Sequence, residues 1–248
     1  MRRPLLAVAA AALAGALVQP GPARAAVAPT SGLVLSYTFD QDQGTAVRDG
    51  AAPALPGTLV GAEPAAAHVP GRAGRGIALE LVGAQHQYVA VPERSGIDVD
   101  RFTLAALVRY SGVENDRTDG RWEVLEKAGA YWLNVRTDGR VRVGGFFGGC
   151  ASARWRYLDS TAVVRVGTWT HLAATYDGAA LTVWVDGVRA GRKAVSGRTC
   201  VNDEPLAVGA KRAPAKGLLE AFWDGQLDDV RVYRRALSAT EIRQLVPA

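Results

Sequence analysis

Closely spaced acidic residues are the feature of this sequence that bears most directly on a chemical reaction. Hydrolysis of a glycosidic bond needs two carboxyl groups that face each other across a cleft. Glu123 and Glu126 are three residues apart, a separation that places them on opposite faces of a regular strand. Asp98 and Asp100 share a face but lie in a turn-like lead-in to a strand. The Glu-x-Asp-x-Glu spacing used for such hydrolysis is absent, so we predict no catalytic residues.

Other catalytic and metal-binding motifs are also missing. The histidines, His68, His86 and His171, are far apart in the sequence and lack the spacing of metal ligands. The sequence contains no Gly-x-Ser-x-Gly, His-Glu-x-x-His or Walker pattern. These absences favour a protein that binds a ligand without changing it.

Aromatic residues are the candidates for ligand binding, because a sugar ring can stack its apolar face on an aromatic side chain. They gather between residues 117 and 160, where an Arg-Trp-Arg-Tyr run mixes aromatic and basic groups. Packing in the core is the alternative for the tryptophan of this run. The predicted ligand-binding residues are Trp155, Tyr157, Arg154, Arg156 and Trp122.

The N-terminus has the pattern of a secretory signal peptide. A positive start precedes an apolar stretch from Leu5 to Val18 that is too short for a stable membrane span. The small residues Ala23 and Ala25 predict cleavage after Ala25, with an uncleaved anchor as the alternative. We therefore expect a signal peptide at residues 1–25, a short disordered leader at 26–31, one domain at 32–246 and a secreted protein.

The charge of the mature chain argues against some classes of partner. Cleavage would remove three arginines and no acidic residue, which leaves 26 basic against 24 acidic side chains and lowers the formal net charge from +5 to +2. A nearly neutral protein gives no reason to expect nucleic acid or an anionic membrane as a partner. No second apolar span follows, and we expect a monomer.

Cys150 and Cys200 are the only cysteines. In an oxidising compartment two cysteines most simply pair with each other. Closing a loop of about 50 residues would stabilise the fold by roughly 4 kcal/mol in the chain-entropy model. A reactive thiol is the alternative, but no adjacent histidine is present to activate it. We predict a structural disulfide.

Asp-Gly pairs predict the fold class. Residues 169–189 contain three alternating runs separated by Asp177-Gly178 and Asp186-Gly187, and such pairs between alternating runs are strong hairpin signals. About twelve short strands follow one another at close spacing along the chain. We predict an all-β, two-sheet antiparallel sandwich, with one short C-terminal helix that begins at the capping box of Ser238 and Glu241.

The order of these segments resembles the laminin G-like jelly rolls (laminin G type 3) of bacterial secreted proteins, in the concanavalin A-like lectin/glucanase superfamily. The resemblance extends from residue 32 to residue 245. The matching segments include Leu35-Ser-Tyr-Thr-Phe-Asp, Gly71-Arg-Ala-Gly-Arg-Gly-Ile-Ala-Leu, Phe102-Thr-Leu-Ala-Ala-Leu-Val-Arg, Trp169-Thr-His-Leu-Ala-Ala-Thr-Tyr-Asp-Gly, Val183-Trp-Val-Asp-Gly, Trp223-Asp-Gly-Gln-Leu-Asp-Asp-Val-Arg-Val-Tyr and Arg235-Ala-Leu-Ser-Ala-Thr-Glu-Ile.

The resemblance implies a jelly roll whose first and last strands are neighbours, and members that bind carbohydrate or protein, some with one calcium ion. Calcium requires six to eight oxygen ligands. If the first and last strands are adjacent, Asp40, Asp49 and Asp228 can converge at one edge. We predict one structural calcium ion there, with solvated turn aspartates as the alternative.

The functional prediction is a secreted, non-catalytic, lectin-like module that recognises extracellular carbohydrate. A protein-interaction or adhesion module is one alternative, because the same sandwich serves both purposes. A glycan hydrolase or lyase on the same fold is the other.

Overall fold

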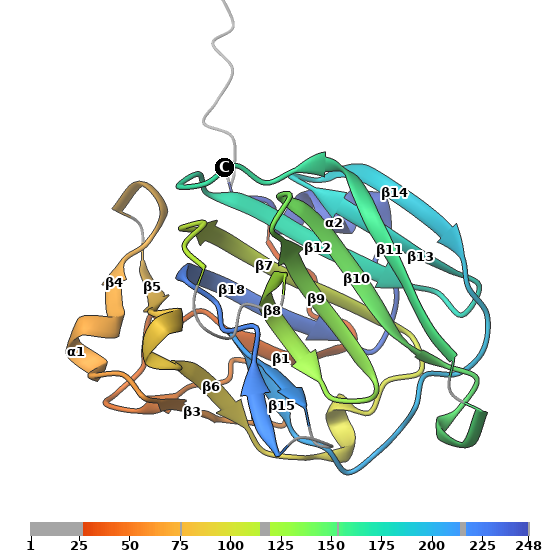
Figure 1. Cartoon of the computed structure of the whole chain (residues 1–248), viewed down its shortest axis with the longest axis horizontal. Coiled ribbons are helices and arrows are strands. Elements are labelled where there is room, and N and C mark those ends of the chain that lie inside the picture. The colour runs from red at the N-terminus through yellow and green to blue at the C-terminus, as the bar shows by residue number, and fades with distance from the viewer. Residues whose placement is uncertain (1–26, 75, 115–119, 153, 214–216, 248) are drawn as a thin grey trace, which may run out of the picture.

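The computed structural model describes residues 27–74, 76–114, 120–152, 154–213 and 217–247, which form two large antiparallel sheets (Figure 1). The first sheet has the order β14-β13-β12-β7-β18-β5-β4, and β1 also pairs with β18. Its strands are β1 (Leu33–Tyr37), β4 (His68–Pro70), β5 (Ile77–Leu81), β7 (Phe102–Tyr110), β12 (Thr170–Tyr176), β13 (Ala180–Val185), β14 (Val188–Ala194) and β18 (Gly225–Tyr233).

The second sheet has the order β11-β10-β9-β8-β15-β6-β3-β2. Its strands are β2 (Ala46–Val47), β3 (Gly57–Val60), β6 (Tyr88–Val91), β8 (Arg121–Lys127), β9 (Tyr131–Arg136), β10 (Arg140–Phe147), β11 (Arg154–Val163) and β15 (Leu206–Val208). The remaining elements are the β16 (Lys211–Ala213) and β17 (Leu218–Glu220) hairpin, the helices α1 (Pro64–Ala67) and α2 (Ala239–Leu245), and short 3₁₀ turns at Arg72–Gly74, Gly83–Gln85, Ser95–Ile97 and Cys150–Ser152.

The Asp-Gly pairs form the hairpin turns that the sequence predicts. Asp186 and Gly187 join β13 to β14 with φ angles of 47° and 74°, and tight hairpins of this kind need a left-handed conformation at both residues. Between β12 and β13, the Asp177 carboxylate accepts hydrogen bonds from two backbone N–H groups of the turn. These local contacts explain why the hairpins can be read from the sequence.

The core lies between the two sheets and takes alternate side chains from each. Leu104 on β7 and Leu172 on β12 belong to the same buried cluster as Leu133 on β9 and Val143 on β10. Because side chains alternate along a strand, the intervening residues of β8, β9 and β10 face away from this core. The residues on that outer face form the candidate site described below.

The first and last strands are neighbours, as predicted: β1 pairs antiparallel with β18, with Leu35 opposite Val232. The chain then turns into α2, where Ser238 and Glu241 make the predicted capping box. Ile242 and Leu245 on α2 are buried in a second, smaller apolar cluster that includes residues of the first sheet. The helix therefore covers part of the outer face of that sheet.

The predicted disulfide between Cys150 and Cys200 is present, and it links the β10–β11 connection to the segment before β15. By contrast, the expectation of a disordered leader at residues 26–31 is wrong for residues 27–31, the part of this segment that the structure describes. The Pro29 carbonyl accepts a hydrogen bond from the Tyr233 hydroxyl, and the Ser31 carbonyl accepts one from the Arg235 guanidinium. These bonds hold the segment against the last strand.

The predicted signal peptide, residues 1–25, lies outside the described residues. Within the part of the chain that is described, neither helix approaches the length and apolarity needed to cross a bilayer.

Candidate ligand-binding groove

The outer face of β8, β9, β10 and β11 carries a groove of about 310 Å³. This volume is near the lower end of the range of about 300–1,000 Å³ that is typical of small-molecule sites. Aromatic, acidic, amide and basic side chains line it together. They are Arg121, Glu123, Glu126, Trp132, Asn134, Arg142, Phe146, Trp155 and Lys211.

A bulge in β8 places both glutamates of this strand in the groove, so the expectation that they lie on opposite faces is wrong. The pairing with β9 shifts between Glu123 and Leu125, so β8 carries one extra residue at this point. Val124 and Leu125 are both buried in the core. Glu126 therefore returns to the same face as Glu123, and both carboxylates line the groove.

Strand register arranges the aromatic residues of the groove in one block. Trp132 on β9 is opposite Gly144 on β10, which is in turn opposite Tyr157 on β11. A Cβ atom on Gly144 would lie 2.2 Å from the Trp132 ring, so the missing side chain makes room for the indole. Trp155 stacks on Trp132 with ring centroids 6.0 Å apart, and its own side chain is 49% exposed. The result is an aromatic platform open to solvent.

A second row across the same strands is polar. Glu123 on β8 is opposite Asn134 on β9, and Asn134 is opposite Arg142 on β10. The Asn134 amide nitrogen donates to the Glu123 carboxylate at 3.2 Å. Arg142 forms a bidentate ion pair with Asp159, at 2.6 and 2.8 Å, and its guanidinium lies 4.0 Å from the centre of the Tyr157 ring. The polar row therefore runs beside the aromatic platform.

One acceptor in this row has no protein partner. The Asn134 side-chain oxygen is buried and makes no hydrogen bond with any described residue. A buried polar atom without a partner costs roughly 1–3 kcal/mol, so such atoms are rare unless a ligand or water satisfies them. Asn134 lines the groove, so a hydroxyl or amide of a bound ligand is a candidate partner for this oxygen.

The two groove glutamates resist ionisation. Burial raises the pKa of Glu126 to about 7, against the opposing effects of Lys211 and of a hydrogen bond from the Arg212 backbone N–H. Burial, reinforced by the nearby charge of Glu126, raises the pKa of Glu123 well above its usual range. Titratable groups that are perturbed by burial and lie together in a cleft are typical of functional sites.

The structure separates the predicted ligand-binding residues. Trp155 lines the groove, and Tyr157 lies next to it with ring centroids 4.9 Å apart. Arg154 and Arg156 alternate with these residues on β11 and line a different hollow beside residues 194–196. The prediction that Trp122 binds ligand is wrong. Trp122 is 2% exposed and belongs to the core, because it alternates with the groove residues of β8.

The residues predicted to bind calcium are also separated. Asp40 and Asp228 line a second hollow of about 270 Å³ on the first sheet, together with Arg72 and Asp229. Asp49 does not line it. Instead its carboxylate accepts hydrogen bonds from three backbone N–H groups, those of residues 36, 51 and 55.

The remaining carboxylates do not provide a calcium site on their own. Burial, followed by the charge of Asp229, raises the pKa of Asp228 to about 7, and Asp40 accepts a hydrogen bond from the Ile77 backbone N–H at 2.7 Å. Within the described ranges, no three His, Cys, Asp or Glu side chains are grouped so that they could hold a metal ion. Since calcium prefers six to eight oxygens, these residues do not fit the ion without further ligands. Calcium binding here stays a prediction.

Family comparison agrees with the fold. Residues 83–243 match the Laminin_G_3 model, described as the concanavalin A-like lectin/glucanases superfamily. This chain belongs to that family. No curated protein matches this chain.

Solved structures similar to this Laminin_G_3 chain include toxin and arabinanase domains. The binding domain of Paraclostridial Mosquitocidal Protein 1 has a TM-score of 0.66 and 15% identity, over 87% of this chain and 52% of that one. Domain 4 of AbnA, a GH43 extracellular arabinanase from Geobacillus stearothermophilus, in complex with arabinotriose, has a TM-score of 0.63 and 18% identity, over 88% and 100%.

The binding domain of botulinum neurotoxin DC in complex with SialylT has a TM-score of 0.60 and 9% identity, over 87% of this chain and 50% of that one. The Laminin_G_3 chain thus spans about half the length of both toxin domains and the whole arabinanase domain. At these identities the likeness concerns the fold.

Proposed function

We propose that this chain binds carbohydrate in the groove on β8–β11 and does so without a chemical step. The observation that carries the proposal is the solvent-exposed Trp155 stacked on Trp132, beside a row of hydrogen-bonding groups that includes the unpartnered oxygen of Asn134. This combination is what a sugar requires: an aromatic surface for the apolar face of the ring, and fixed donors and acceptors for its hydroxyl groups.

In the proposed complex a sugar ring stacks on Trp155, and its hydroxyl groups face the polar row. Asn134 accepts a hydrogen bond, Glu123 accepts or donates according to its protonation, and Arg142 donates with the bonding capacity that its ion pair leaves available. Because Asp159 and the Tyr157 ring hold Arg142, little conformational entropy is lost when the ligand binds. The small volume of the groove favours a short oligosaccharide or one end of a chain.

The structural neighbours support a carbohydrate ligand, since two of them are complexes with arabinotriose and with SialylT. The disulfide supports a location outside the cytosol, in line with the N-terminal pattern of a secreted protein. A protein ligand at the same groove is the alternative if no glycan binds.

The test is a Trp155→Ala variant, measured on a glycan array that contains arabino-oligosaccharides and sialylated glycans. We expect the native protein to bind a subset of the array, and the variant to lose about tenfold or more in affinity, which corresponds to about 1.4 kcal/mol of lost stacking on the indole. Val188→Ala, at an exposed position of β14, is the control and should bind as the native protein does. Equal affinity of native protein and Trp155→Ala for every bound glycan would remove the proposal.

Glycoside hydrolysis is a second candidate function, favoured by one observation. The bulge brings Glu123 and Glu126 to the same groove, where both have raised pKa values. Two carboxyl groups of this kind are the machinery that glycosidases use. Release of reducing ends from a bound oligosaccharide, abolished by both Glu123→Gln and Glu126→Gln, would replace the binding proposal with this one.

A further inference from the structure

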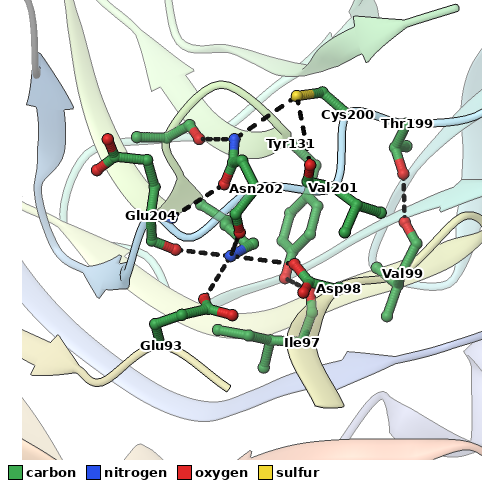
Figure 2. A network of polar contacts seen from close by, with 12 residues as sticks. Glu93, Ile97, Asp98, Val99, Tyr131, Thr199, Cys200, Val201, Asn202 and Glu204 are labelled. Carbon is green, nitrogen blue, oxygen red and sulfur yellow. Dashed lines mark hydrogen bonds and ion pairs between the residues drawn. The ribbon is translucent and has the colours of Figure 1, made fainter. Parts of the chain in front are cut away.

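The side chain of Lys127, at the end of β8, is completely buried and surrounded by oxygen atoms. Its ammonium nitrogen lies 2.5 Å from a Glu93 carboxylate oxygen and 3.1 Å from Asp98 Oδ1. The backbone carbonyl oxygens of Asn202 and Glu204 lie at 2.8 and 2.6 Å. In Figure 2, the four oxygens converge on the one nitrogen from separate segments of the chain. We call these four oxygens the oxygen cage.

The oxygen cage has the composition of a cation site rather than that of an ordinary lysine contact. An ammonium group has three protons, so it cannot donate a full hydrogen bond to each of four oxygens. Asp98 Oδ1 is buried and lies 3.1 Å from the ammonium nitrogen. It makes no hydrogen bond of good geometry with any described residue. Carboxylates combined with backbone carbonyls are the ligands that calcium takes in proteins.

The surrounding charge also fits a cation with more than one positive charge. Glu93 and Asp98 bring two negative charges against the single charge of Lys127. The Tyr131 hydroxyl donates a hydrogen bond to the Ile97 carbonyl beside the cage.

We propose that the oxygen cage is a calcium-type cation site in which the ammonium of Lys127 takes the place of the ion. In the native protein the Lys127 ammonium joins the loop before β7 to the segment before β15. This link does not depend on calcium in the medium. When the ammonium is removed and its space is left open, the cage binds Ca²⁺ through the two carboxylates, the two carbonyls and water. This site is separate from the groove and does not depend on the proposed carbohydrate binding.

The test compares thermal unfolding in EDTA and in millimolar calcium for the native protein and for Lys127→Ala. The change in Tm of the native protein on adding calcium is the reference, because it includes any calcium binding at Asp40 and Asp228. Lys127→Ala should be destabilised in EDTA, and calcium at ~100 times its Kd should raise its Tm by about 5–10 °C more than that of the native protein. Lys127→Met, whose side chain fills the space without charge, should lose stability equally in both solutions.

A second readout reports on the cage directly. Tb³⁺ substitutes for Ca²⁺ and luminesces when a tyrosine nearby absorbs light, and Tyr131 adjoins the cage. Lys127→Ala should give terbium luminescence above the native background, and the further change Glu93→Gln should remove the excess. A calcium response of Lys127→Ala no larger than the native one, no excess luminescence, or a variant that stays unfolded in calcium would each overturn the proposal.

Discussion

At the scale of single residues, the groove contains side chains that oppose folding. Glu123 and Glu126 are buried, and burial is the main cause of their raised pKa values. At a pH where both groups are ionised in the unfolded chain, keeping them in the groove lowers the stability of the folded protein. Residues that reduce stability while lining a cleft are expected where a site needs their chemistry.

Glu126→Gln should therefore stabilise the protein in alkaline solution. The folded pKa of about 7 lies above the unfolded value of about 4.5, so stability that is present below pH ~4.5 is lost as the pH rises through about 7. We expect the urea midpoint of the variant to exceed the native one at pH 8 and to match it more closely at pH 5. Glu114→Gln, at an exposed position, is the control. A native advantage at pH 8 would contradict this account.

His171 should make the protein sensitive to acid. Burial, followed by the charge of Arg231, lowers its pKa to about 4. Stability is full above the unfolded pKa of about 6.5 and falls as the pH drops to about 4, by about 3 kcal/mol in total. His171→Leu should lack this part of the acid loss, as urea titrations at pH 7 and pH 4 would reveal. Parallel loss in variant and native protein would show that other groups cause it.

At the scale of elements, strand β10 determines the shape of the platform. Gly144 leaves the space in which the Trp132 ring lies, and a Cβ atom there would also come within 2.9 Å of the Arg156 carbonyl. The strand cannot yield easily, because β10 is hydrogen-bonded on both sides, to β9 and β11. The position of the indole is thus a property of the three strands together.

Gly144→Ala should displace Trp132 and weaken ligand binding. We expect a loss of about 1–3 kcal/mol in stability from overpacking, and about tenfold in affinity for any glycan that the native protein binds. Gly96→Ala is the matched control, since a Cβ atom at Gly96 meets nothing within 4 Å. Calorimetry and urea unfolding provide the two measurements. Native affinity in Gly144→Ala would place the ligand away from the platform.

At the scale of the whole molecule, covalent and ionic links hold the same region of the chain. The disulfide at Cys200 and the carbonyls of Asn202 and Glu204 around Lys127 lie within a few residues of one another. This segment leads into β15, which pairs with β8, the strand that carries both groove glutamates. The links therefore tie the ends of groove strands, at Lys127 on β8 and at Cys150 between β10 and β11, to the segment before β15.

Replacing Cys150 and Cys200 with serine should lower the free energy of unfolding by roughly 4 kcal/mol, because the closed loop of about 50 residues gains freedom in the unfolded state. Glycan affinity of the folded variant should stay within about twofold of the native value. Urea unfolding with and without reductant measures the effect, and reductant should change only the native protein. An unchanged unfolding free energy would refute a stabilising role for the link.

The sequence by itself determined the local and repetitive features of this protein. The Asp-Gly hairpins, the capping box at Ser238 and the sandwich class follow from contacts within a few residues and from alternation along strands. The disulfide followed from having two cysteines and one way to pair them. The hairpins and the capping box depend on short-range chemistry, whereas the disulfide could be predicted because two cysteines leave only one pairing.

Only the tertiary structure decided the composition of the groove. One extra residue in β8 moved Glu126 to the face of Glu123, and strict alternation would have placed it in the core. Alternation along a strand separates Trp122 from Glu123, and Arg154 and Arg156 from Trp155, but only the packed sheets show which of the two faces carries the groove. Bulges and cross-strand register come from the summed packing of both sheets, so residues distant in the chain determine which side chains meet.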